Sequence, residues 1–243
     1  KEGVPLVCGE DDPHLAAVIA RETRRRRGRF YRADSLVRVA NVNNCGLEGF
    51  IVDLQWAHHD LAGIRLPLAG SFQLRNLKTA GGILCLLEAK GFLLTDEDIA
   101  LGLAGVKWPG RMERVSSKPE VIIDAAHNPH AACHLARSLE EIYPGRQRVL
   151  VLGILNDKDA AGIMRELAFS TRCCVVTRPE GPRGNGWHQR FKEARRFIPD
   201  VAAVESIEDA VRAGIEMARQ DEYVLITGSF YTINRARSLF YKY

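Results

Sequence analysis

The sequence has no apolar run long enough to cross a membrane and no C-x-x-C pair of cysteines. A membrane helix needs about 18 or more consecutive apolar residues, and the 243 residues contain no such stretch. No secretory signal pattern opens the chain. Cysteines occur at positions 8, 45, 85, 133, 173 and 174, without a C-x-x-C pair. Cys173 and Cys174 lie in the apolar run CCVV, which favours core packing. We therefore expect a reduced, cytoplasmic protein with no membrane partner.

The excess of basic over acidic residues is also small. The net charge is only +4, and much of the basic excess falls in one run, Arg24 to Arg27. A nucleic-acid-binding surface usually spreads basic residues over a face and interleaves aromatic ones. This run instead ends a helical pattern over 13–27, just before Gly28, as is typical of a helix C-terminus. We interpret it as a solvated helix end, with an anion or RNA patch as the alternative, and expect no nucleic-acid partner.

What the sequence does contain is ample apolar material, most clearly patterned in its second half. It is 46% hydrophobic and 26% charged, as in globular proteins. Short apolar runs recur at 121–124, 149–153, 173–177, 202–204 and 223–227, followed by helix-like segments at 129–142, 160–169, 187–197, 207–219 and 232–241. Five strand-then-helix units predict an α/β fold: a Rossmann-like parallel sheet with helices on both faces. Ligands bind beyond the carboxyl ends of such strands.

The first half of the sequence predicts fewer β-strands than the second half. We expect a strand at 4–9, a helix at 13–27, a hairpin of 36–42 with 49–55, and helices at 74–90 and 96–104. Trp56, His58 and His59 are interpreted as an exposed hairpin end without function. Because this is too little sheet to close a core, we interpret the half as the end of a larger α/β domain, with a boundary between 117 and 118. The opening Lys1, in place of Met, leads us to expect a longer protein.

Four segments carry a family resemblance. They are LAGSFQLRN at 68–76, WPGRME at 108–113, DAAHNPHA at 124–131 and TGSFY at 227–231. They resemble the L-x-G-x-H-Q-x-x-N, W-P-G-R-x-E, D-G-A-H-N-P-H-A and T-G-S-L-Y motifs of folylpolyglutamate and dihydrofolate synthases, in the family's order and spacing. Two departures occur: Phe72 replaces the usual His, and Ala125 the usual Gly. Neither removes a residue with which the family holds nucleotide.

This resemblance implies a Mur-ligase-type protein. Residues 1–117 would be the C-terminal part of the ATP-binding domain, and 118–243 a Rossmann-like C-terminal domain of the glutamate ligase type. The implied activity is ATP-dependent ligation of L-glutamate to folate, or to dihydropteroate, through an acyl phosphate, by a monomer that uses ATP and Mg²⁺. Related ligases of peptidoglycan precursors or cyanophycin, and a non-catalytic paralogue that binds a ligand or partner, remain as alternatives.

The family's phosphate loop, G-T-N-G-K-G-S, does not occur in the 243 residues. By resemblance it would lie upstream, as would a segment whose carbamylated Lys supports a metal ion, with Lys1 as the last Lys of that segment. The metal ligands would then lie mainly upstream. We therefore expect no metal site wholly within these residues and no activity from them alone.

Two candidate site residues follow the strand at 121–124. Asp124 would end the strand directly before a helix N-terminus, where Asn128 can cap, and such a start attracts anionic ligands. The resemblance assigns Asp124 a contact with ATP, most simply the ribose hydroxyls, and places His127, the catalytic candidate, beside it. The alternative for Asp124 is that it only satisfies the turn. His127, His130 and His134 could suggest zinc, but no acidic or Cys ligand completes a tetrahedral set.

The other nucleotide candidates are Arg111 and Asn76. A guanidinium suits phosphate because its fork of donors binds oxygens bidentately and stays charged. By resemblance Arg111 binds the ATP phosphates, the alternative being an interdomain salt bridge with Glu113 or a neighbour. An amide offers both the donor and the acceptor that adenine's edge requires. Asn76 would by resemblance contact adenine across the domain junction, the alternative being a surface or capping role.

A last group is predicted at the strand ends of the second half. Ser229 and Tyr231 follow the last strand, Arg183 follows the third, and Lys158 lies in NDKD, which resembles a family D-K-D. These four could bind glutamate or close the cleft, and loop structure explains them equally well.

Overall fold

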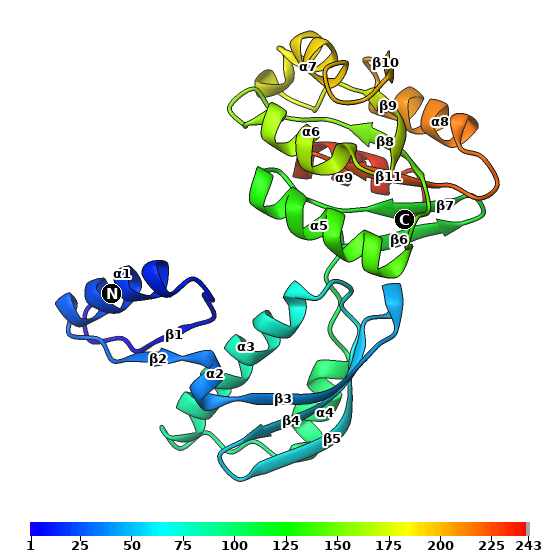
Figure 1. The fold of residues 1–243 in the computed structure, drawn as a ribbon. Helices are drawn as coiled ribbons and strands as arrows, with labels where there is room; N and C mark the ends of the chain where they lie inside the picture. The colour runs from blue at the N-terminus through cyan, green and yellow to red at the C-terminus, as the bar shows by residue number, and fades with distance from the viewer. Residues whose placement is uncertain (242–243) are drawn as a thin grey trace. The chain divides into compact units, whose positions relative to one another are not determined.

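The computed structural model describes residues 1–241, which fall into two compact units, 1–107 and 108–241 (Figure 1). The division falls between 107 and 108 and not between 117 and 118, where the sequence placed it. The reason is that Glu113–Ser117 form a strand that pairs with the next strand of the second unit. Within the described residues, the helices are all too short or too polar to span a membrane.

The second unit is built on a six-stranded sheet. Its strands are β6 (Glu113–Ser117), β7 (Glu120–Ile123), β8 (Arg148–Leu152), β9 (Thr171–Val176), β10 (Asp200–Ala203) and β11 (Tyr223–Thr227). They lie in the order β10-β9-β8-β11-β7-β6, with β6 antiparallel to β7 and every other pair parallel. The predicted parallel α/β sheet is therefore confirmed. The antiparallel edge strand β6 was not predicted.

Helices cover both faces of this sheet. They are α5 (Pro129–Ile142), α6 (Ala160–Ala168), α7 (Trp187–Ala194), α8 (Ile207–Met217) and α9 (Phe230–Arg237), with a 3₁₀ turn at Pro182–Gly184. Figure 1 shows α5 and α6 on one face, and α8 and α9 on the other. Side chains of α8 and α9 share one core cluster with alternate strand residues such as Val149, Val151 and Cys173, and Cys174 is buried as well. Both cysteines are thus core residues, as expected.

Capping side chains fix the starts of α5, α6, α8 and α9. Asn128 accepts a hydrogen bond from the backbone N–H of Ala131 at the start of α5, and Asp159 and Ser206 cap α6 and α8 in the same way. Such caps satisfy N–H groups that have no partner within the helix. Because the parallel strands all end at one edge of the sheet, the loops after β7, β8, β9 and β11 lie at the same edge.

The first unit contains two small sheets. β1 (Leu6–Cys8) pairs in parallel with β2 (Phe30–Arg32), and β3 (Arg38–Asn44), β4 (Phe50–Trp56) and β5 (His59–Leu66) form an antiparallel sheet. The helices are α1 (Pro13–Arg25), α2 (Ala33–Leu36), α3 (Phe72–Glu88) and α4 (Asp96–Ala104), with a 3₁₀ turn at Gly46–Glu48. The predicted hairpin is confirmed as β3–β4. The strands β2 and β5 were not predicted.

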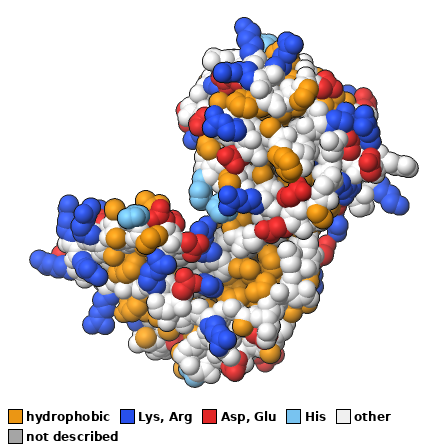
Figure 2. Space-filling model, viewed as in Figure 1, with side chains coloured by type: hydrophobic (Ala, Val, Ile, Leu, Met, Phe, Trp, Pro, Cys, Tyr) orange, Lys and Arg blue, Asp and Glu red, His pale blue; other side chains and the backbone are white. Residues whose placement is uncertain are grey.

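The basic run at the end of α1 is exposed and paired with acidic neighbours. Figure 2 shows Lys and Arg side chains gathered over this helix. Arg26 donates to Glu22 at 2.7 Å, and Arg27 lies 3.1 Å from Glu2. The solvated helix end that the sequence predicted is therefore present, and local ion pairs accompany it.

The end of the β4–β5 hairpin differs from its prediction. Trp56 and His59, interpreted as exposed, are both buried, and only His58 faces solvent. The reason is that β4 and β5 pack against α3 and α4. Trp56 donates to Glu88 of α3, and His59 contacts both Glu88 and Asp96 of α4. These partners are some 30 to 40 residues away along the chain, so the local pattern did not reveal them.

Candidate active site

The segment Trp108–Glu113 that enters the second unit is a tightly held turn. Glu113 accepts from the guanidinium of Arg237 at 3.0 Å, from the hydroxyl of Tyr241 at 3.1 Å and from the backbone N–H of Gly110 at 2.8 Å. Burial alone would raise the pKa of Glu113, but the hydrogen bonds from Arg237 and Gly110 outweigh it and lower that pKa. The turn is thereby anchored at one end by a charged pair.

Asp124 anchors the same turn from the end of β7. Its side chain accepts from the backbone N–H of Met112 at 3.0 Å and from that of Ala126 at 2.8 Å. The carboxyl group is only 4% exposed. Burial raises its pKa to about 6, against the opposing effect of the two backbone hydrogen bonds and of the Arg111 charge. The turn-satisfying role that the sequence left open for Asp124 is thus present.

The backbone of this turn is strained at Met112, and Gly110 has no room for a side chain. Gly110 has φ +73° and Met112 has φ +44°, both in the left-handed region that non-glycine residues rarely adopt. A Cβ atom at Gly110 would lie 2.7 Å from the side chain of Ile233 on α9. The backbone N–H of Ala125 donates to the carbonyl of Gly110 at 2.9 Å. Strain of this kind persists only where the surroundings impose it, and it commonly marks functional sites.

Arg111 stands at the centre of the turn, and both it and His127 lie beside the ring of Phe230. Its guanidinium carbon lies 5.4 Å from the ring centre of Phe230, which in turn lies 5.8 Å from the ring centre of His127. Glu113, the alternative partner for Arg111, is paired with Arg237 instead. Within residues 1–241, Arg111 forms no ion pair with an acidic side chain. A half-buried guanidinium without a carboxylate partner is suited to bind an anion.

The imidazole of His127 has a defined tautomer. Its Nδ1 lies 2.9 Å from the carbonyl oxygen of Ala125, so that Nδ1 carries the hydrogen and donates it. The second ring nitrogen, Nε2, then keeps a lone pair. His127 is therefore oriented by the same β7–α5 loop that holds the turn of Arg111.

A second group of polar side chains gathers where β8, β9 and β11 end. Arg183 donates to the hydroxyl of Tyr231 at 3.0 Å, and its guanidinium carbon lies 5.5 Å from the Tyr231 ring centre. Asp157 lies 3.2 Å from Lys158 and 3.7 Å from Arg183. Three of the four predicted cleft residues, Lys158, Arg183 and Tyr231, are thus brought together from three loops.

Ser229, the fourth of these residues, occupies a different environment. It is 1% exposed, and its hydroxyl caps α9 by accepting from the backbone N–H of Thr232 at 3.1 Å. The side chains of Ser229 and Thr232 also share a hydrogen bond of 2.9 Å. Its observed contacts position the start of α9, which carries Phe230 and Tyr231.

Asn76 lies in the first unit, on the exposed side of α3 near its start. Its amide Nδ2 donates to Oε1 of Gln73 at 2.8 Å, which leaves its Oδ1 as an acceptor. The predicted contact with adenine stays a prediction.

The side chains at this edge of the sheet are better suited to bind a phosphate group than a metal ion. Mg²⁺ requires several oxygen ligands, but the carboxylate of Asp124 is buried and occupied by two backbone N–H groups, and that of Asp157 faces two cations. His130 and His134 on α5 approach to 3.3 Å, yet no third ligand joins them among the described residues. We therefore derive no step through a metal ion at this edge of the sheet.

Phe230 and Arg237 were not singled out from the sequence. Phe230 stands within TGSFY, where the family motif has Leu, and that departure was the available signal for it. Nothing in the local pattern indicated that Arg237 reaches Glu113, more than a hundred residues earlier in the chain.

Comparisons with known proteins show which family the chain resembles. Residues 110–230 match the family model "Mur ligase, glutamate ligase domain". The chain is 32% identical, over 256 aligned positions, to the dihydrofolate synthase/folylpolyglutamate synthase of Mycobacterium tuberculosis, covering 96% of this chain and 51% of that relative. It is 30% identical to the folylpolyglutamate synthase of Lacticaseibacillus casei, covering 98% of this chain and 54% of that relative.

A solved structure shows the same fold. The Mycobacterium tuberculosis folylpolyglutamate synthase complexed with ADP matches with a TM-score of 0.87 and 29% identity, covering 98% of this chain and 55% of that one. The chain therefore spans about half the length of the relatives it matches.

Proposed function

The chain belongs to the folylpolyglutamate synthase and dihydrofolate synthase family, and we propose that the whole protein joins L-glutamate to a folate, or to dihydropteroate, with ATP. In the proposed reaction, a substrate carboxylate attacks the γ-phosphorus of ATP and ADP leaves. The amine of glutamate then attacks the acyl phosphate, phosphate leaves and the amine loses a proton. Both steps build negative charge on phosphate oxygens, so a site for them needs fixed positive charge.

The observation that carries the proposal is the Arg111 turn. Its guanidinium projects from a strained backbone that Asp124 and Glu113 hold in place, and it has no carboxylate partner among the described residues. A cation that is already positioned can neutralise phosphate charge without a further ordering cost. We assign Arg111 to the phosphates of ATP, and Asp124 both to supporting this turn and to the ribose.

His127 is assigned to the reacting centre. Because its Nδ1 donates to Ala125, its Nε2 can accept a proton from the glutamate amine or a hydrogen bond from a ligand. Its position next to Phe230, which also contacts Arg111, puts it in the same group of side chains as the phosphate-binding candidate.

The cluster of Lys158, Arg183 and Tyr231 is assigned to glutamate. Glutamate brings two carboxylates, and a guanidinium with a neighbouring ammonium and hydroxyl matches one of them. Asp157, which now balances these cations, is partly exposed and can turn away when a carboxylate arrives. Ser229 supports this group by capping the helix that starts beside Tyr231.

The test is a ligase assay of the whole protein with ATP, Mg²⁺ and L-glutamate, with dihydropteroate and a reduced folate in separate arms. We expect ADP release that equals the formation of a product heavier by one glutamyl residue, and no product when glutamate is left out. ADP release only with a peptidoglycan precursor or a cyanophycin primer would overturn the proposal. So would nucleotide binding without turnover in any arm.

The 243-residue chain provides a further arm. Since it contains no phosphate loop, we expect no ADP release from it, and turnover near the ~10 per second typical of enzymes would contradict that expectation.

A further inference from the structure

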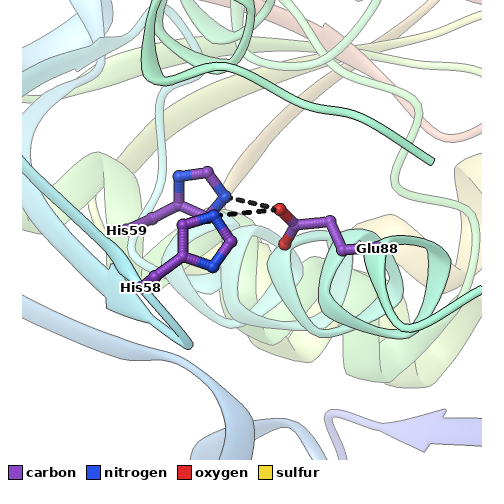
Figure 3. A group of neighbouring side chains, drawn as sticks. All are labelled: His58, His59 and Glu88. Atoms are coloured by element: carbon purple, nitrogen blue, oxygen red, sulfur yellow. Dashed lines mark hydrogen bonds and ion pairs between the residues drawn. The ribbon is translucent and has the colours of Figure 1, made fainter. Parts of the chain in front are cut away.

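Three potential metal ligands converge at the end of the β4–β5 hairpin in the first unit. His58 and His59 come from the turn and the first residue of β5, and Glu88 is the last residue of α3. Figure 3 shows both imidazoles directed toward the Glu88 carboxylate. Nε2 of His59 lies 2.6 Å, and Nε2 of His58 3.7 Å, from the same oxygen, Oε1 of Glu88. One ligand atom from each residue falls within 4.8 Å of the other two.

The other polar side-chain atoms of His59 and Glu88 are already occupied. Nδ1 of His59 lies 2.5 Å from Oδ1 of Asp96, and Nε1 of Trp56 donates to Oε2 of Glu88 at 3.0 Å. A carboxylate on the far nitrogen of a histidine is the usual outer partner of a metal-bound imidazole, because it fixes the ring and leaves the other nitrogen for the metal. The indole similarly fixes the carboxylate of Glu88 with Oε1 facing the two imidazoles.

Burial makes two of the three ligands rigid and leaves the site reachable. The side chain of His59 is 2% exposed and that of Glu88 is 12% exposed, whereas that of His58 is 74% exposed. An ion can therefore arrive from the side of His58 and meet two ligands that are already in place.

We propose that His58, His59 and Glu88 bind a zinc ion through Nε2, Nε2 and Oε1. Zinc forms bonds of about 2.0–2.2 Å to histidine nitrogen and carboxylate oxygen. Two ligands of one tetrahedral ion then lie roughly 3.3 Å apart. The observed separations from Oε1 of Glu88, 2.6 and 3.7 Å, lie on either side of that value, and the three ligand atoms all lie within 4.8 Å of one another, so shifts of roughly 1–1.5 Å complete the site.

The donor set selects the class of metal. Two imidazoles and one carboxylate suit zinc and similar divalent transition metals, whereas Mg²⁺ and Ca²⁺ prefer oxygen ligands. Three protein ligands leave a fourth position, on the exposed side of His58, for water. The bound ion would tie the hairpin turn to the end of α3 and, through Asp96, to the start of α4. This site is independent of the proposed ligase activity, and the sequence analysis expected no metal site here.

The test is zinc binding by the untagged 243-residue chain after treatment with a chelator. Competition with a chromophoric zinc indicator gives the affinity, and the visible spectrum of added Co²⁺ reports four-coordinate geometry. We expect one equivalent of zinc to bind and to raise the melting temperature. His58→Ala should weaken binding at least tenfold, and Asp96→Asn, which removes only the outer partner, by about 10- to 100-fold. The matched control is His130→Ala with His134→Ala, the other close histidine pair, which should leave the affinity unchanged.

Two results would overturn the proposal. One is the absence of zinc binding tighter than about 1 mM, which would leave His59 as a histidine held by two carboxylates and no more. The other is binding that survives His58→Ala but is lost in the α5 control. Since the side chain of His58 is largely exposed, that variant should fold even if a change at the buried Glu88 does not.

Discussion

Replacing Asp124 with Asn exchanges one oxygen of a buried side chain for an amide nitrogen and removes its titration. In the wild-type chain, burial raises the pKa of this carboxyl from the ordinary 3.8 to about 6. A difference of two pKa units corresponds to roughly 3 kcal/mol, at 1.36 kcal/mol per unit. This is the free energy that the folded protein loses when it must hold the charged form.

The sign follows from which state binds the proton. Between about pH 4 and 6, folded Asp124 keeps a proton that the unfolded chain has already released, so the free energy of unfolding falls as the pH rises through that window. Below it both states are protonated, and above it both are ionised and the loss stays constant. The Asn variant lacks this change, although it loses an acceptor for either the Met112 or the Ala126 N–H, at a cost of about 1–3 kcal/mol.

The prediction is therefore about the difference between two stability curves. The free energy of unfolding of the wild type minus that of Asp124→Asn should fall by roughly 3 kcal/mol from pH 4 to pH 7. Urea unfolding monitored by hydrogen-exchange protection of β7 and β11 peptides reports the second unit by itself. Asp221→Asn, at an exposed position, is the control and should give no such change. A difference that stays constant within about 1 kcal/mol would refute the reasoning.

Three further predictions concern the same turn and its neighbours. Arg111→Ala in the whole protein should lower kcat/KM at least 30-fold, about 2 kcal/mol, and should change the free energy of unfolding by less than about 1 kcal/mol. The surface control Arg212→Ala should change neither quantity. Collapse of the fold with normal activity per folded molecule would contradict this prediction. His127→Ala should mainly lower kcat, with ATP affinity by calorimetry changed less than about tenfold, and a rise in KM alone would argue against its place at the reacting centre. Gly110→Ala should lower the melting temperature more than Gly145→Ala, which has a similar φ but open space around it; equal effects would show that the clash is unimportant.

The second unit could be predicted from its sequence because local signals agree there. Each strand is a short apolar run, and capping residues such as Asn128 and Ser206 mark where the following helices begin. Strand β5 was missed because its pattern, HDLAGIRL, mixes polar and apolar residues around a glycine and becomes a strand only by pairing with β4. Strand β6 was likewise not predicted, since its charged and hydroxyl residues suit an exposed edge and form no apolar run.

The candidate site could be predicted only as a set of residues and not as an arrangement. The motifs indicated Arg111, Asp124 and His127. They did not reveal that the ring of Phe230 lies beside both Arg111 and His127. Likewise, the sequence could not decide whether Arg111 forms a salt bridge with Glu113. In the structure Glu113 pairs with Arg237 instead, and Arg237 lies on the last helix. The burial of His59 was hidden for the same reason. In each case the deciding contact joins segments that are distant along the chain.

The position of β11 also determines when the second unit can fold on the ribosome. β7 and β8 are synthesised early, but they are not hydrogen-bonded to each other, since β11 lies between them. A nascent chain that has not yet released β11 therefore exposes two apolar strand edges, which are liable to pair wrongly. Insertion of β11 closes the sheet and in the same step brings Phe230 and Tyr231 to the loops after β7 and β9. The candidate site is thus completed late in synthesis, and chains terminated before β11 should be targets for chaperones and proteases.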